Sequence, residues 1–251
     1  MLPSEEQRLI FERFTDEKSR AEALDRLSRG EPVQYITGEA YFYGEVYSVS
    51  PDCLIPRPDT ERLVDRIVRI AGEKSVCIID LCTGSGCVAI SSAAHCPNLR
   101  VTAADISEGA LALAKQNAVR NGVDKRVGFI RADIKDDAFI AGLPDRGYDI
   151  IVSNPPYIAT GVIGTLDDSV KHEPVLALDG GVDGLGFYRV ILQKYKSKLA
   201  PDGVLLLEIG YDQADAMRGL AGEYGYTCGI FRDYGGNDRV AELRVNPLPM
   251  L

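Results

Sequence analysis

The stretch SNPPYI, residues 153–158, places an asparagine and two prolines directly after the apolar run YDIIV, which is typical of a buried strand. Proline donates no backbone hydrogen bond, so it ends a strand at its own position. The two prolines also restrict the residues before them to extended conformations. The result is a stiff loop that holds the Asn154 amide, the Tyr157 ring and free backbone carbonyls in fixed positions. We therefore expect this loop to position a bound group.

A glycine-rich turn ends another apolar run, in the stretch IIDLCTGSGCVAI. Gly84 and Gly86 permit a tight turn and a close approach of a ligand to the backbone. The spacing Gly84-x-Gly86-x-x-Ala89 also satisfies the dinucleotide fingerprint, a short pattern that does not identify a ligand by itself. Asp80 separates the two interpretations, because a carboxylate just before the turn would repel a pyrophosphate but would suit a cationic group.

Two further aspartates are expected near this turn, because ligands of an open parallel sheet bind beyond the carboxyl ends of its strands. Asp105 ends the second predicted strand, where an acid commonly binds ribose hydroxyls. Asp133 ends the third and could accept a hydrogen bond from an adenine amino group. Three aspartates at successive strand ends fit an adenosyl ligand with an ammonium and a sulfonium group, which is S-adenosylmethionine. The predicted cofactor-binding residues are Asp80, Cys82, Thr83, Gly84, Ser85, Gly86, Asp105, Ile106, Asp133, Ile134 and Asn154.

The elements that must position these residues alternate between strands and helices from residue 73 onward. We expect strands at SVCIIDL, RVTAADI, RVGFIRADI, YDIIVSN and GVLLLEIG, and a closing strand pair at YTCGIFRD and RVAELRV. Helices are expected at GCVAISSAAH, at SEGALALAKQNAVRNG with Ser107 as its cap, at GFYRVILQKYKSKL and at DQADAMRGLAGEYG. Nearly continuous apolar strands that alternate with helices indicate a parallel sheet covered on both faces, which is a doubly wound α/β domain.

The first 72 residues have a different pattern. Two short helices are predicted within residues 1–30, and the aromatic and β-branched segment 33–50 is predicted to be a hairpin. A further helix follows, with Asp59 or Thr60 as its cap. We therefore divide the chain into a short helical segment, 1–30, a hairpin with a connecting helix, 31–72, and the α/β domain, 73–251.

Composition and charge narrow the classes of function. The 251 residues are 45% hydrophobic and 26% charged, as in soluble globular proteins, and no uncharged apolar run approaches the length of a membrane span. The charged N-terminus is not a signal peptide, so a cytoplasmic location is expected. Six cysteines without zinc spacing and two histidines predict reduced thiols and no metal site. A net charge of −9 argues against a broad nucleic-acid surface.

The NPPY string after the fourth strand resembles the loop of class I methyltransferases that methylate planar, conjugated nitrogens of adenine, guanine or a glutamine amide. The strings PVQYITGEAYFYG, LIPRPDTERLV, DLCTGSGCVAI, HEPVLALDGGVDGLGFYRVI, LLLEIGYDQ and DYGGNDRV extend this likeness. Together they resemble the release factor glutamine methyltransferase family, over about residues 31 to 245.

The resemblance implies a class I S-adenosylmethionine-dependent methyltransferase fold with a seven-stranded, mostly parallel sheet. It implies methylation of the glutamine side-chain amide in the Gly-Gly-Gln motif of class-1 peptide chain release factors. S-adenosylmethionine would be the methyl donor and S-adenosylhomocysteine the product, with no direct nucleic-acid or membrane partner. Catalytic roles would fall to Asn154, Pro155 and Tyr157, and substrate contacts to these three and Pro156.

The expected chemistry depends on positioning, because the delocalised lone pair makes an amide nitrogen a poor nucleophile. The Asn154 side-chain carbonyl and the Pro155 backbone carbonyl can each accept one N–H of the substrate amide. Both hydrogen bonds strengthen as the nitrogen becomes positive in the transition state. Tyr157 would pack on the planar amide, and no strong general base is needed.

Other functions stay open at this point. The family that methylates a glutamine of a large-subunit ribosomal protein shares DLCTGSGC and SNPPY, whereas IPRPDTE and DYGGNDRV favour the release factor enzymes. A nucleic-acid base methyltransferase would need a basic face or a target-recognition domain. A nicotinamide-linked oxidoreductase would leave NPPY without a role.

Two features depart from the family pattern. The helical N-terminal region of about 30 residues is shorter than the usual N-terminal domain, which bears on substrate docking. Cys82 stands where many relatives have glycine.

Overall fold

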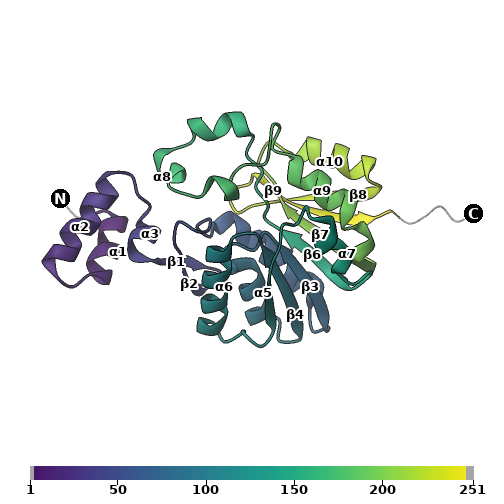
Figure 1. Cartoon of the computed structure of the whole chain (residues 1–251), viewed down its shortest axis with the longest axis horizontal. Helices are drawn as coiled ribbons and strands as arrows, with labels where there is room; N and C mark the ends of the chain where they lie inside the picture. The colour runs from purple at the N-terminus through teal and green to yellow at the C-terminus, as the bar shows by residue number, and fades with distance from the viewer. Residues whose placement is uncertain (1–2, 247–251) are drawn as a thin grey trace, which may run out of the picture.

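A seven-stranded sheet forms the centre of the computed structural model, which describes residues 3–246 (Figure 1). Its strand order is β5-β4-β3-β6-β7-β9-β8. The first five strands in this order pair in parallel, whereas β9 is antiparallel to both of its neighbours. The predicted doubly wound sheet and its closing strand pair are therefore confirmed. The strands are β3 (Val76–Leu81), β4 (Leu99–Asp105), β5 (Val127–Arg131), β6 (Tyr148–Ser153), β7 (Leu199–Glu208), β8 (Tyr226–Arg232) and β9 (Asp238–Val245).

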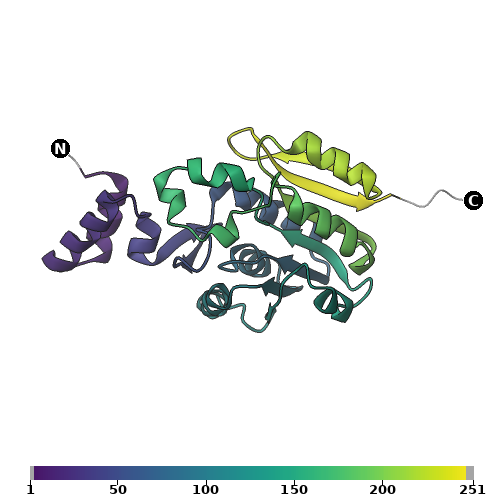
Figure 2. The same ribbon diagram turned by 45° about the horizontal axis from the view of Figure 1, so that its top comes forward.

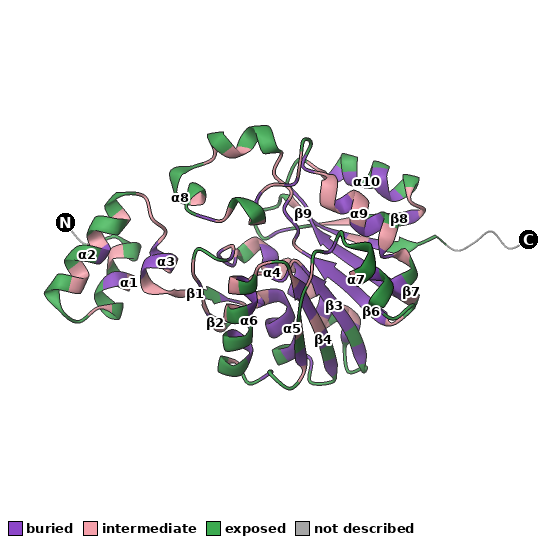
Figure 3. Cartoon of the chain, viewed as in Figure 1, coloured by how far each residue is buried: buried purple, intermediate pink, exposed green. Residues whose placement is uncertain are grey.

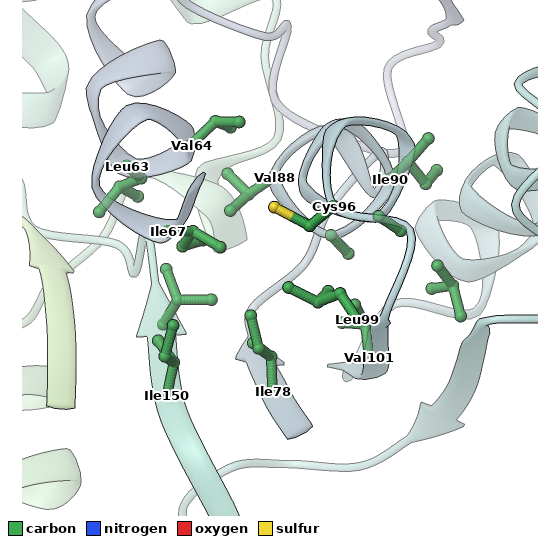
Figure 4. Packing of buried hydrophobic residues seen from close by; sticks show 14 of the residues in the cluster. Leu63, Val64, Ile67, Ile78, Val88, Ile90, Cys96, Leu99, Val101 and Ile150 are labelled. Atoms are coloured by element: carbon green, nitrogen blue, oxygen red, sulfur yellow. The ribbon is translucent and has the colours of Figure 1, made fainter. Parts of the chain in front are cut away.

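Helices cover both faces of this sheet. Successive residues of a strand point to opposite faces, so a strand of apolar residues needs helices packed on both sides. On β3, Ile78 packs in one core with α4 (Glu61–Ala71), α5 (Cys87–His95) and α6 (Glu108–Arg120). Its neighbour Ile79 packs in a second core with α7 (Asp137–Gly142), α9 (Gly186–Lys194) and α10 (Ala214–Glu223). Figure 3 shows the buried strands between these layers, and Figure 4 shows the first core from close by.

Helix caps show where local sequence signals hold and where they do not. The predicted cap Ser107 accepts a hydrogen bond from the Ala110 N–H at 3.1 Å at the start of α6. Of the two residues predicted to cap α4, Thr60 is its N-cap residue but makes no capping hydrogen bond with its side chain, and Asp59 lies one residue earlier in the short 3-10 helix η1 (Pro58–Thr60). Tertiary partners take both side chains instead, since Asp59 lies 3.4 Å from Arg239 and Thr60 bonds to Asn154.

The N-terminal part contains the two predicted helices, α1 (Glu5–Arg13) and α2 (Glu17–Ser28). The hairpin is confirmed as β1 (Glu39–Phe42) and β2 (Glu45–Ser48). Its predicted first residues are wrong, because Val33–Thr37 form the short helix α3. Tertiary burial overrides their β-branched and aromatic composition, since Val33 and Ile36 pack against α1 and α2.

The division of the chain at residues 30 and 72 stays a prediction. Phe42, Tyr47 and α4 join the first core of the sheet, whereas α1 and α2 share a small separate cluster with α3 (Figure 1). No helix within residues 3–246 has both the length and the apolar character to cross a membrane.

An insert between β6 and α9 was not predicted from the sequence. It contains η2 (Thr160–Thr165), α8 (Asp168–Lys171) and η3 (Val175–Ala177), and it lies beside the segment that leads into α4 (Figure 2). Glu173, which is buried in the insert, joins the two segments: its carboxylate accepts a hydrogen bond from the Ile55 N–H at 3.0 Å and pairs with Arg57. The helix α7 was likewise not predicted.

Candidate active site at the carboxyl ends of the strands

A cavity opens where β3, β4 and β6 end, with about 1130 Å³ of free space including its mouth. The position agrees with the rule that ligands of doubly wound sheets bind beyond the carboxyl ends of the strands. Most of the predicted site residues line it, namely Asp80, Cys82, Thr83, Gly84, Ser85, Asp105, Ile106, Asp133, Ile134, Asn154 and Pro156. Gly86, Pro155 and Tyr157 are not among the lining residues.

The two glycines of the turn have different tasks. A side chain at Gly86 would place its Cβ 2.8 Å from Ile90 and 3.1 Å from Ala114, so this glycine allows α5 to pack on α6. Gly84 also has a positive φ of 56°, but a Cβ there would meet nothing within 4 Å. Gly84 therefore leaves open space at the cavity, as a ligand close to the backbone requires.

Cys82 has a backbone conformation that favours glycine. Its φ of 60° lies in the left-handed region, which L-residues with a side chain seldom adopt. The side chain of Cys82 therefore strains the start of the turn, and it forms part of the cavity wall.

Asp105 holds the turn in place from the end of β4. One of its carboxylate oxygens accepts a hydrogen bond from the Gly84 N–H at 2.8 Å, and the other from the Ser107 N–H at 2.9 Å. Burial raises the pKa of Asp105, and these backbone donors oppose that effect because they stabilise the ionised form. Each oxygen keeps a lone pair for a ligand hydroxyl.

Asp80 is the most deeply buried carboxylate on the cavity wall, with 1% of its surface exposed. The Thr83 hydroxyl donates to it at 2.6 Å. Burial raises the pKa of Asp80 to about 7, since the charged form is poorly solvated there. A cationic ligand group would reverse this effect by pairing with the carboxylate.

Two other polar groups of the cavity wall are suited to a ligand. Asp133 is exposed and accepts a hydrogen bond from the Lys135 N–H at 2.9 Å. The Ser85 hydroxyl is buried in the turn and has no hydrogen-bond partner within residues 3–246. A polar ligand beside the turn would give this hydroxyl a partner.

The proline loop presents one amide to the cavity. Pro155 and Pro156 are buried, and the Ser153 hydroxyl anchors the start of the loop by donating to the Leu81 carbonyl at 2.6 Å. Asn154 donates from Nδ2 to the Thr60 hydroxyl at 3.2 Å. Its Oδ1 accepts no hydrogen bond from the part of the chain that the structure describes, so it is available to a donor in the cavity.

The side chain of Tyr157, the aromatic residue of the proline loop, packs against the second core. Its hydroxyl donates to Glu208 at 3.2 Å, and its carbonyl accepts from the Gln213 amide at 2.9 Å. Its backbone also contacts the glycine-rich segment of the insert, where a Cβ on Gly184 would lie 2.3 Å from the Tyr157 carbonyl oxygen. Packing of the Tyr157 ring on a substrate amide stays a prediction.

Sequence reasoning missed two features around the cavity, the insert and one buried carboxylate. The insert residues Pro174, Leu176 and Ala177 complete the cavity wall beside the segment 52–57, and Glu173 joins the insert to this segment through the Ile55 N–H and Arg57. Behind the proline loop lies Glu208, whose pKa is raised by burial to about 7. A lone acid in the apolar run LLLEIG is the sequence signal for this buried carboxylate.

Comparisons with known proteins agree on one family. Residues 60–171 match the family model described as "Methyltransferase small domain". A release factor glutamine methyltransferase of Moorella thermoacetica is 42% identical over 221 residues, which cover 87% of this chain and 76% of that protein. The enzyme of the same name from Agrobacterium fabrum is 40% identical over 237 residues, which cover 91% of this chain and 80% of that protein.

Solved structures also share the fold. The catalytic domain of hMettl16, in complex with a hairpin of the MAT2A 3′UTR, superposes with a TM-score of 0.64. The alignment covers 92% of each chain at 14% identity, so it concerns the architecture alone.

Proposed function

The chain belongs to the release factor glutamine methyltransferase family, and we propose that it methylates the glutamine side-chain amide in the Gly-Gly-Gln motif of class-1 release factors. Its fold is that of the class I S-adenosylmethionine-dependent methyltransferases. One observation carries the proposal: the open glycine turn and the Asn154 amide line the same cavity. A methyl donor and a planar amide can therefore meet there.

S-adenosylmethionine suits the groups on the cavity wall. Asp80 would pair with its ammonium group, Asp105 would accept from its ribose hydroxyls, and Asp133 would accept from its adenine amino group. The orphan Ser85 hydroxyl and the open space at Gly84 support a polar ligand beside the turn. When bound, the sulfonium supplies an activated methyl group, so the protein needs to contribute mainly position and electrostatics.

The proline loop would hold the substrate amide. Asn154 Oδ1 would accept one N–H, and the Pro155 backbone carbonyl the other. Two acceptors at fixed positions orient the nitrogen, and both hydrogen bonds strengthen as positive charge develops on it. Pro155 and Pro156 contribute stiffness, since a fixed φ limits how far the acceptors can move.

Class-1 release factors are the proposed partners, in the cytoplasm. They would offer the glutamine on a flexible glycine-rich tip that can enter a narrow site. The wall formed by residues 52–57 and the insert would surround this tip, with Arg57 at the cavity. The helices α1 and α2, which pack apart from the sheet core, would add peripheral docking area.

A parallel assay tests the proposal. Purified enzyme is incubated with labelled S-adenosylmethionine and, separately, a class-1 release factor, the same factor with the motif glutamine replaced by alanine, ribosomal proteins, and DNA. We expect label only on the intact release factor. Label on a ribosomal protein glutamine would support the related family instead, and label on DNA would refute protein methylation.

A further inference from the structure

Glu208 is a buried carboxylate that the proposed chemistry does not use. It ends β7 directly behind the proline loop, and only 2% of its surface is exposed. The Tyr157 hydroxyl donates to its Oε1 at 3.2 Å, whereas Oε2 has no hydrogen-bond partner within residues 3–246. Buried polar atoms almost always have a partner. We therefore expect a nearby group to donate a hydrogen bond to Glu208 Oε2.

The Thr60 hydroxyl has a hydrogen that it could donate to Glu208 Oε2. Its side chain is 2% exposed, and its hydroxyl oxygen accepts a hydrogen bond from Asn154 Nδ2. The hydroxyl still carries one hydrogen of its own, whose direction rotates to suit an acceptor. The Thr60 hydroxyl lies near enough to Glu208 to lower the pKa of that carboxyl.

We propose that Glu208 and Thr60 are positioning residues that fix the orientation of the Asn154 amide. An ionised carboxylate only accepts hydrogen bonds, so Tyr157 and Thr60 must both donate to it. Thr60 has then used its proton and can only accept from Asn154. The amide must therefore direct Nδ2 to Thr60 and Oδ1 into the cavity. This orientation is the one that the proposed methylation needs, so the inference rests on the proposed function for its consequence.

Protonation of Glu208 would remove this directionality. A neutral carboxyl can donate to Thr60, whose own hydrogen could then point to Asn154. The amide could turn over and present its NH2 group to the substrate, where two donors would face each other. Amide orientation is decided by such networks and not by the shape of the side chain.

The groups that face Glu208 come from several elements. Arg239 on β9 and the Tyr157 hydroxyl lower the pKa of Glu208, and Asp59 in η1 raises it. Tyr188 on α9 and Cys87 on α5 are also close enough to interact with its charge. Burial outweighs the favourable partners and leaves the pKa of Glu208 at about 7, within the range of an ordinary assay.

The first test is single-turnover methylation of a release factor at saturating S-adenosylmethionine, from pH 5.5 to pH 9. We expect the wild-type rate to fall below about pH 7 and Glu208→Gln to lose this acid limb. Thr60→Val should lower the rate at pH 8 by about tenfold or more, about 1.4 kcal/mol in barrier. Thr60→Ser keeps the hydroxyl and should recover most of the rate. Calorimetric affinity for S-adenosylmethionine should change by less than about threefold in each variant, a shift below about 1 kcal/mol.

A second measurement does not depend on activity, and its main observation is made on the wild type. The side-chain NH2 signals of Asn154 in ¹⁵N-labelled protein are assigned by their loss in Asn154→Ala and followed over the same pH range at saturating S-adenosylmethionine, which keeps Asp80 ionised. We expect them to shift with the ionisation of Glu208 in the wild type and to stay constant in Glu208→Gln. A wild-type rate in Thr60→Val, an unchanged acid limb in Glu208→Gln, or pH-independent Asn154 signals would overturn the proposal. Failure of the wild type to methylate a release factor would instead refute the proposed function, while the NMR result would still decide the amide orientation.

Discussion

Asp80 should make binding of S-adenosylmethionine depend on pH. Burial raises the pKa of this carboxyl to about 7 in the free protein, so a large share of molecules carry it in the neutral form near neutral pH. Pairing with the ammonium group of the ligand requires the ionised form. Below pH 7, binding must therefore release a proton, and the affinity should fall as the pH falls.

The size of the effect follows from this pKa. With a pKa of about 7 in the free protein and a much lower one in the complex, the affinity is reduced about elevenfold at pH 6 and about 1.3-fold at pH 7.5. The dissociation constant should thus rise by about eightfold between these two pH values, or about 1.2 kcal/mol. The ligand ammonium, with an ordinary pKa of about 7.7 to 8.0, stays mostly charged over this range.

The effect of Asp80 on the pH dependence of folding stability has the opposite sign to that of an aspartate whose pKa is lowered on folding. Since the pKa of Asp80 is raised on folding, ionisation disfavours the folded state, and stability is lost as the pH rises through about 7. A shift from 3.8 to about 7 corresponds to roughly 4 kcal/mol at pH 8, an upper estimate. Asp80→Asn, which cannot ionise, should therefore melt at a higher temperature than the wild type at pH 8, while the two should converge toward pH 4.

Isothermal titration calorimetry at pH 6 and pH 7.5 measures the affinity. Two buffers of different ionisation enthalpy at each pH report the released proton. Asp80→Asn should bind more weakly at pH 7.5 and show no proton release. The matched ligand control is 5′-methylthioadenosine, which lacks the ammonium group and should bind with the same affinity at both pH values. An equal wild-type affinity at both pH values, or the same pH dependence in Asp80→Asn, would refute the pairing of Asp80 with the ammonium.

Three further predictions concern the turn, the proline loop and the N-terminal helices. Asn154→Ala should leave cofactor affinity mostly intact but lower single-turnover methylation by about a hundredfold, the loss expected for one preorganised polar contact to developing charge; near wild-type turnover would exclude the role. Asp105→Ala should weaken S-adenosylmethionine binding by about 1–3 kcal/mol, because ligand hydroxyls and the Gly84 N–H lose their acceptor; unchanged affinity by calorimetry would reject the ribose assignment. Removal of residues 1–28 should weaken apparent affinity for the release factor and leave the saturating single-turnover rate largely unchanged. Contacts outside the reacting groups affect how tightly the substrate binds, and not the barrier once it is bound. A collapsed saturating rate in a truncation that circular dichroism shows to be folded would mean that these helices shape the active site.

The sequence by itself was sufficient wherever a short local pattern has one physical outcome. Alternating apolar strands and helices predicted the parallel sheet, and the rule on strand ends placed Asp80, Asp105 and Asp133 around one cavity. Ser107 capped its helix because the cap needs only a donor three residues away. Two prolines predicted a stiff loop at Asn154, since their backbone restrictions hold in any tertiary context.

Only the tertiary structure decided which long-range partners the remaining side chains would find. Thr60 had the local chemistry of a helix cap, but Asn154 competes for its hydroxyl from 94 positions away. Val33–Thr37 had strand-like composition, but burial against α1 and α2 makes a short helix more favourable there. Glu208 and Tyr157 meet behind the proline loop because β6 and β7 are neighbours in the sheet. Local patterns contain no information on such neighbours, because these contacts depend on the three-dimensional packing of elements that are distant in sequence.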